Sequence, residues 1–259
     1  MIDLHAHLLP QVDDGPSDWE EVRKMLETGV KDGIKEAVCT SHVLNELSED
    51  LEAKFQFKFQ QLQKLVEDWK IPIQLWLGAE IHINAQFDPL SPLATLAGNR
   101  KYILLELPLT EMPHGTSERL FELSLAKLQP ILAHPERNLV LSQKPQMAYE
   151  FVQRGVLFQI NAGSLTGAFG RHVRKMAFSF LEHRLVHFVA SDCHGFRARA
   201  MHLSKAYQLV HRKYGQAMAD LLFKENPRKA IRGEEISMEE PVPFVKVKKP
   251  LFSFLRKSP

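Results

Sequence analysis

The sequence predicts an α/β fold, namely a closed or nearly closed barrel of seven parallel strands. Short apolar runs alternate with segments of helical periodicity along most of the chain, and this alternation is typical of βαβ units. The length of 259 residues suits one such barrel. Histidines and carboxylates also follow the apolar runs, and a barrel of this type carries its active site at the carboxyl ends of its strands.

Seven segments are predicted as strands: 1–5, 37–40, 73–77, 102–107, 130–133, 157–161 and 186–191. The first helix is expected to begin at 16–20, where Ser17 and Glu20 are spaced as a capping box, and Gly33 is placed to end it. Further helices are expected at 48–69, 117–128, 145–154, about 173–181 and about 198–224, mostly from their helically spaced apolar residues.

Composition narrows the class of protein. The chain is 44% hydrophobic and 25% charged, which is ordinary for a globular protein. Its net charge of +2 argues against a general role in binding nucleic acid. The two cysteines lie far apart and suit a reducing compartment. Neither a secretory signal nor an apolar run of about 20 residues is visible. We therefore expect a cytoplasmic protein.

Six of the seven predicted strands bring a candidate metal ligand to the same end of the barrel. Imidazole and carboxylate are common ligands of divalent metals. His5 and His7 differ by two positions, so on a strand they point to the same side. Glu80 and Glu106 each carry two oxygens and can bridge two cations, although a salt bridge to a lysine or arginine is the alternative for Glu106. The candidates are His5, His7, His42, Glu80, Glu106, His134, Asp192 and His194. This pattern indicates a multinuclear metallohydrolase.

The motifs resemble those of the polymerase and histidinol phosphatase (PHP) superfamily. Within it, the sequence is similar to the bacterial protein-tyrosine phosphatases of capsular and exopolysaccharide gene clusters, from Met1 to about Ile231. The motifs are His5-x-His7, Asp13-Asp14-Gly15, Ser41-His42, Gly78-x-Glu80-Ile81, Glu106, His134-Pro135-Glu136-Arg137, Asn161-Ala162-Gly163-Ser164-Leu165, Ser191-Asp192-x-His194 and Asn226-Pro227-Arg228-Lys229.

The resemblance implies a distorted, TIM-like (β/α)7 barrel of the PHP type with three divalent metal ions, usually manganese, with iron or zinc as alternatives. It implies one set of ligands for each metal and two arginines, Arg137 and Arg199, that hold the phosphate. The implied ligands are His5, His7, Glu80 and Asp192 for the first metal, Glu80, Glu106 and His134 for the second, and Asp14, His42 and His194 for the third.

The implied reaction is hydrolysis of phosphotyrosine by hydroxide formed at the metals. The implied substrate is a membrane-associated bacterial tyrosine kinase that controls capsular or exopolysaccharide synthesis. Two alternatives within the superfamily are a small-molecule phosphatase, such as a histidinol-phosphate phosphatase, and a non-catalytic module. A third alternative comes from Cys193 and Arg199, which fit the Cys-x5-Arg loop of cysteine-dependent phosphatases. His194 and the single glycine in that segment argue against it.

Residues 1–240 are predicted to form one barrel domain. Residues 241–259 form a tail that combines basic and apolar side chains. Its basic residues are compatible with peripheral contact with an anionic membrane, although they do not require it. A disordered tail and a strap packed on the barrel are the alternatives.

Overall fold

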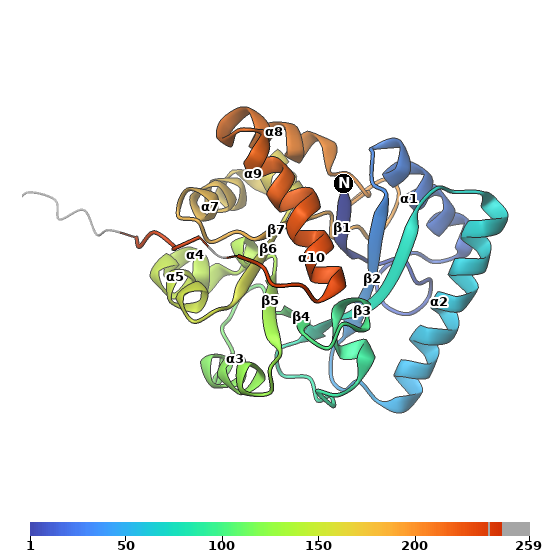
Figure 1. Cartoon of the computed structure of the whole chain (residues 1–259), viewed down its shortest axis with the longest axis horizontal. Coiled ribbons are helices and arrows are strands. Elements are labelled where there is room, and N and C mark those ends of the chain that lie inside the picture. Colours follow the sequence, from blue (N-terminus) through green and yellow to red (C-terminus); the bar gives the residue numbers. More distant parts are fainter. Residues whose placement is uncertain (238, 245–259) are drawn as a thin grey trace, which may run out of the picture.

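The computed structural model describes residues 1–237 and 239–244, which fold around one parallel sheet. Its strands lie side by side in sequence order, and every neighbouring pair is parallel. A parallel bridge between Ala6 and Cys193 joins the two edges, so the sheet curls into a nearly closed barrel (Figure 1). The predicted (β/α)7 barrel is therefore confirmed. The strands are β1 (Ile2–Ala6), β2 (Glu36–Val43), β3 (Gln74–His82), β4 (Tyr102–Glu106), β5 (Gln129–Ala133), β6 (Leu157–Asn161) and β7 (Phe188–Ala190).

Helices surround the barrel and also close one end of it (Figure 1). The larger helices are α1 (Trp19–Lys31), α2 (Glu49–Trp69), α3 (Thr116–Leu125), α5 (Pro145–Gln153), α7 (Gly170–Glu182), α8 (Ser204–Tyr214) and α10 (Asn226–Arg232). Ala230 and Ile231 of α10 pack against interior side chains at the starts of the strands, such as Ile2 and Tyr102. The amino-terminal end of the barrel is thereby filled with apolar groups, which leaves the opposite end for polar chemistry.

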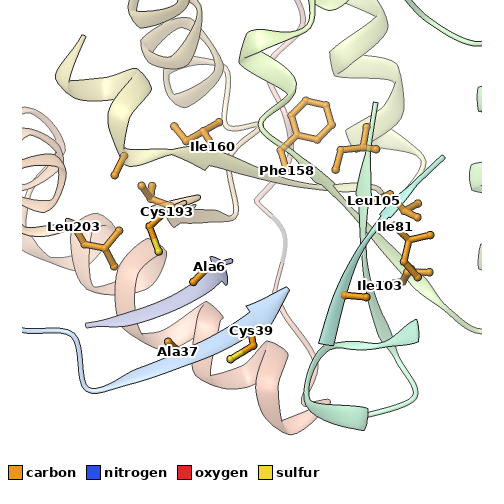
Figure 2. Close-up of a cluster of buried hydrophobic side chains, with 14 of the residues drawn as sticks. Ala6, Ala37, Cys39, Ile81, Ile103, Leu105, Phe158, Ile160, Cys193 and Leu203 are labelled. Carbon is orange, nitrogen blue, oxygen red and sulfur yellow. The ribbon is translucent and has the colours of Figure 1, made fainter. Parts of the chain in front are cut away.

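The strands separate two apolar layers. The outer layer lies between the strands and the helices, and Figure 2 shows part of it, including Cys39, Ile81, Leu105 and Phe158. The inner layer fills the barrel and includes Leu4, Val38, Leu104 and Ile131. Inward and outward residues alternate along each strand, as the pleat of a strand requires. Polar side chains that continue the inward rows therefore converge at the carboxyl ends of the strands.

A bulge in β1 changes this alternation just before the first histidine. Asp3 pairs with Ala37 and Ala6 pairs with Cys39, so three steps along β1 match two steps along β2. Ala6 consequently faces the outer layer, while Leu4 and His5 both face the interior. The amide of Ala6 donates to the Thr40 hydroxyl over 3.0 Å. Bulges commonly redirect side chains next to active sites, and here the bulge turns His5 inward.

Three details differ from the sequence prediction. The cap of α1 is Asp18, which accepts from the Glu21 amide, and not Ser17 with Glu20. The segment 198–224 is not one helix, because Gly215 ends α8 with its amide donating to His211. The chain continues through α9 (Gln216–Asp220), a π-helical turn η4 (Leu221–Glu225) and α10. The short elements that the periodicity did not predict are η1 (Pro92–Ala94), η2 (Leu96–Gly98), η3 (Pro135–Arg137), α4 (Leu139–Gln143) and α6 (Ala162–Thr166).

The chain after α10 runs along the barrel. Ile236 is buried in the inner layer, the Val242 amide donates to His183 O over 2.9 Å, and the Phe244 ring stacks on His183 at 3.7 Å between centroids. The remainder of the predicted tail, with its proposed membrane contact, lies outside the described residues. No helix in the described part of the chain is both long and apolar enough to cross a membrane.

Acid should destabilise the barrel partly through His187, which lies just before β7. The side chain is buried, and its Nδ1 accepts from the Phe158 amide over 3.1 Å. Burial lowers the pKa of His187 to about 4, below the value near 6.5 in an unfolded chain. The unfolded chain then binds more protons between these values, so the free energy of unfolding falls as the pH drops from 6.5 towards 4. At pH 5 the loss should reach about 2 kcal/mol.

His187→Asn keeps an acceptor and removes the titration. Urea unfolding of metal-free wild type and variant at pH 7.5 and pH 5 checks the expectation. The advantage of the wild type should shrink at pH 5, and an unchanged difference would contradict it.

Candidate metal centre

A buried carboxylate lies at the centre of the polar cluster at the carboxyl ends of the strands. Glu80 of β3 is fully buried. Its Oε2 lies 3.0 Å from His5 Nε2, 3.3 Å from His7 Nε2 and 3.1 Å from His42 Nδ1. Its Oε1 lies 3.1 Å from His134 Nε2. Four imidazoles, supplied by β1, β2 and β5 or by the residues directly after them, therefore meet one carboxylate.

The remaining candidates lie around this centre. Glu106 approaches His134 Nε2 at 3.6 Å and His42 Nδ1 at 3.4 Å. Asp192 Oδ1 lies 3.5 Å from His5 Nε2 and 3.7 Å from His7 Nε2. The structure thus brings these sequence-selected side chains together with Glu80 in one place.

Asp14 completes the cluster at its outer edge. The side chain is 64% exposed, and its Oδ1 lies 3.2 Å from His194 Nε2 and 3.5 Å from His42 Nε2. The cluster thus runs from the buried Glu80 to the solvent-facing Asp14, so a substrate can reach it from this side.

Within the described part of the chain, three groups of donor atoms are compact enough to hold a cation, with all donor atoms of a group within 4.8 Å of one another. They overlap the three ligand sets that the resemblance implies. His7 also joins the outer group, and His42 also joins the group of Glu80 and Glu106. The groups are His5, His7 and Glu80; His42, Glu80 and Glu106; and His7, Asp14, His42 and His194.

The candidates do not all lie beyond the strands, as the sequence pattern suggested. His42 and Glu80 belong to strands, because β2 and β3 extend further than expected, and His5 and Glu106 lie within β1 and β4, inside the predicted strand bounds. His134 follows β5 directly with a positive φ of 35°. Asp192 also has a positive φ, of 53°. Non-glycine residues seldom adopt this conformation, and it is frequent at functional sites.

The hydrogen bonds around His5 and His7 favour a cation between them. His5 Nδ1 lies 2.8 Å from Gln159 Oε1, and His7 Nδ1 lies 2.8 Å from Asp13 Oδ2. Both oxygens accept, so both Nδ1 atoms carry the proton and both neutral rings have a lone pair on Nε2. These Nε2 atoms are only 3.2 Å apart. Two facing lone pairs repel unless a proton or a metal ion lies against them.

The charges of the cluster also favour a bound cation. Burial alone would raise the pKa of Glu80, but the surrounding imidazoles hold it well below its usual range. The pKa of Asp192 is likewise lowered, despite burial, by His5 and other cationic neighbours. Against the effect of burial, carboxylates raise the pKa of His7 to about 10. The pocket therefore stabilises positive charge, and its N and O donors fit divalent metals.

Two arginines reach the same cluster. Arg137 Nη1 donates to Asp192 Oδ2 over 3.2 Å, and Arg199 Nη2 donates to Asp192 Oδ1 over 2.5 Å. The Arg137 guanidinium also lies over the Phe169 ring at 4.4 Å. Arg197, by contrast, is exposed and lies over Phe196 at 5.0 Å. Of the two arginines in this segment, only Arg199 contacts the cluster.

Cys193 points away from the cluster. Its side chain is fully buried in the outer layer near Ala6 and Leu203 (Figure 2). Burial raises the pKa of its thiol well above the usual value. The His194 amide, which a phosphate cradle would need, instead donates to Arg199 O over 3.0 Å. The geometry therefore contradicts a Cys-x5-Arg phosphate loop.

Several side chains that orient the candidates had no predicted role. Asp13 accepts from the His42 amide as well as from His7, and Gln159 holds His5. Glu136 accepts from the Asn161 amide and the Ser164 hydroxyl, so it joins the loop after β5 to the start of α6. The two polar residues of the otherwise apolar 157–161 strand, two positions apart, were a usable signal for Gln159 and Asn161.

The chain is similar in sequence to a known family and to named phosphatases. The sequence model of a family described as capsular polysaccharide synthesis, CpsB/CapC, matches residues 1–232. The tyrosine-protein phosphatase YwqE of Bacillus subtilis (strain 168) is 33% identical over 256 residues, covering 98% of this chain and 100% of that protein. The putative tyrosine-protein phosphatase CapC of Staphylococcus aureus is 32% identical over 253 residues, covering 96% and 98% respectively.

A solved structure is similar over nearly the whole chain. It comes from a crystallographic study of YwqE from Bacillus subtilis and CpsB from Streptococcus pneumoniae, described as unique metal-dependent tyrosine phosphatases. The TM-score is 0.85 at 29% identity, and the match covers 95% of this chain and 100% of that chain. The family resemblance drawn from the sequence is confirmed.

Loss of a candidate ligand should empty a metal position without unfolding the barrel. His134→Ala and Glu106→Gln remove donors at the ends of β5 and β4, where they contribute little to the apolar layers. We expect each variant to bind less metal than the wild type, with an unchanged circular dichroism spectrum. Elemental analysis after reconstitution measures the metal. A full metal complement in both variants would contradict the ligand assignment.

Proposed function

Because this chain belongs to the CpsB/CapC family of capsular polysaccharide synthesis proteins, we propose that it is a metal-dependent protein-tyrosine phosphatase. The observation that carries the proposal is the fully buried Glu80, which four imidazoles surround with two arginines nearby. An uncompensated carboxylate at this depth would be costly. A cluster of cations compensates it and at the same time supplies a site for phosphate chemistry.

We expect three divalent ions, with manganese as the metal. The proposed ligands are the members of the three groups together with His134 and Asp192, which lie beside His5 and Glu80. Bound ions of this kind lower the pKa of water so that hydroxide is available near neutral pH. The chain itself supplies the geometry. Glu80 is shared between groups, Asp13 and Gln159 hold the protons of His7 and His5 on Nδ1, and Asp14 faces the solvent side, from which substrate arrives.

Arg137 and Arg199 are proposed to bind the phosphate and to stabilise the charge that develops on its oxygens. A planar guanidinium matches phosphate through paired hydrogen bonds. The Phe169 ring packs against the Arg137 guanidinium. Gly163 makes this stacking feasible, since a Cβ at that position would lie 2.8 Å from the Phe169 ring. The Asn-Ala-Gly-Ser-Leu motif thus helps to aim an arginine.

The proposed substrate is phosphotyrosine on a protein, as the names of the relatives indicate for those proteins. We propose a membrane-associated bacterial tyrosine kinase of capsular or exopolysaccharide synthesis as the physiological partner. Turnover of a phosphotyrosine peptide by metal-stripped protein, with Mn, Fe, Zn and Mg added back singly, tests the proposal. Preference for histidinol phosphate over the peptide would overturn it in favour of a small-molecule phosphatase.

The chemistry should not depend on Cys193. We expect Cys193→Ser to keep most of the activity, and Cys193→Ala to do so without placing a hydroxyl in the apolar outer layer. A chelator should abolish turnover, and added manganese should restore it. Peptide hydrolysis by the three proteins, before and after chelation, is the measurement. An inactive Cys193→Ala protein that still binds its metals would point to thiol chemistry instead.

Arg199 should matter for turnover much more than for metal binding. We expect Arg199→Ala to lower kcat/KM about 100- to 1000-fold, as loss of a donor to a developing oxyanion does, with most of its metal retained. Arg197→Ala is the matched control, because Arg197 is exposed and lies over Phe196, and it should behave like the wild type. Parallel loss of metal and activity in Arg199→Ala would show that Arg199 acts only by supporting Asp192.

A further inference from the structure

Strand β6 gives no candidate metal ligand, yet it carries two fully buried polar side chains. Gln159 and Asn161 have no exposed surface and lie two residues apart, so both face the interior. Neutral amides in such a place cost free energy unless their donors and acceptors are paired. The partners of these two amides are therefore informative.

A continuous series of hydrogen bonds connects two candidate ligands through these amides. Asn161 Nδ2 donates to Asp192 Oδ2 over 2.6 Å. Gln159 Nε2 donates to Asn161 Oδ1 over 2.9 Å. His5 Nδ1 donates to Gln159 Oε1 over 2.8 Å. The series closes on itself, because His5 Nε2 lies 3.5 Å from Asp192 Oδ1.

The direction of every bond in this series follows from its first member. An ionised carboxylate offers only acceptors, so Asn161 must turn its NH2 group towards Asp192. Asn161 then presents its oxygen to Gln159, which must answer with its own NH2 group. The oxygen of Gln159 is thereby left for His5, and the proton of a neutral His5 must lie on Nδ1.

We propose that Gln159 is a positioning residue that, oriented by Asn161, fixes His5 as its Nδ1–H form and so keeps the Nε2 lone pair available for a divalent cation. The inference rests on the proposed function, in which His5 and Asp192 bind the same metal. His7 achieves the same form through a carboxylate, Asp13. His5 achieves it through a neutral amide, which adds no charge to the buried cluster.

The test compares matched substitutions in the full chain. Gln159→Met keeps the length of the side chain and removes both hydrogen bonds. Gln129→Met is the control, because Gln129 lies at the start of neighbouring β5 and its amide donates to Gly155 O over 3.0 Å, away from the cluster. Zinc binding to chelator-stripped protein is measured by competition with a chromogenic chelator. We expect Gln159→Met to bind its tightest zinc about 10- to 100-fold more weakly, as loss of an orienting partner commonly does, and the control to match the wild type.

A second measurement detects the proton on His5 Nδ1 directly. In zinc-loaded protein with 15N-labelled histidine, the wild type and the control should show an exchange-protected Nδ1–H signal of His5, which Gln159→Met should lose. Zinc affinity of Gln159→Met within twofold of the wild type, or an equal loss in the control, would overturn the inference. If Gln159→Met does not fold, Asn161→Ala is measured instead, and unchanged affinity there overturns it as well. A wild type that binds no zinc would refute the metal centre, which is a different failure.

Discussion

The structure depends on compensating the charge of one carboxylate that water cannot reach. Glu80 is fully buried, and an ion at such a depth carries a desolvation cost of several kcal/mol even after relaxation. The barrel meets this cost by directing side chains from most of its strands to one point. Parallel strands make this arrangement possible, because their carboxyl ends share one rim and each strand needs to supply only one or two groups.

The orientation of the ligands depends in turn on a surrounding set of neutral and charged partners. Asp13 holds His7 and the His42 amide, and Gly15 fits beside it because a Cβ there would lie 2.9 Å from Asp13 Oδ1. Glu136 ties the loop after β5 to the start of α6. Each of these contacts fixes a ring or a loop before any ligand arrives, so binding requires little reorganisation.

Periodicity alone located all seven strands and most of the long helices, because each has a clear apolar face. It failed where local chemistry decides the geometry. Asp18 caps α1 because its carboxylate reaches the Glu21 amide, whereas the residue pattern predicted Ser17 with Glu20. For the cluster, ligand-type residues were recognisable from their kind and position, whereas the partners were not. Gln159 and Asn161 stand out in an apolar strand, but their roles appear only from their contacts with His5 of β1 and with Asp192 after β7.

The bulge in β1 makes the length of the first strand as important as its composition. Because three steps of β1 match two of β2, Leu4 and His5 share the inward place that a regular strand gives to one residue. Removal of a residue between Asp3 and Ala6 would therefore cost either an apolar side chain of the inner layer or the first histidine. The number of residues in β1 therefore matters for the cluster as much as their identity. The extra residue thus lets one short strand supply an apolar group to the interior and a candidate ligand to the rim at consecutive positions.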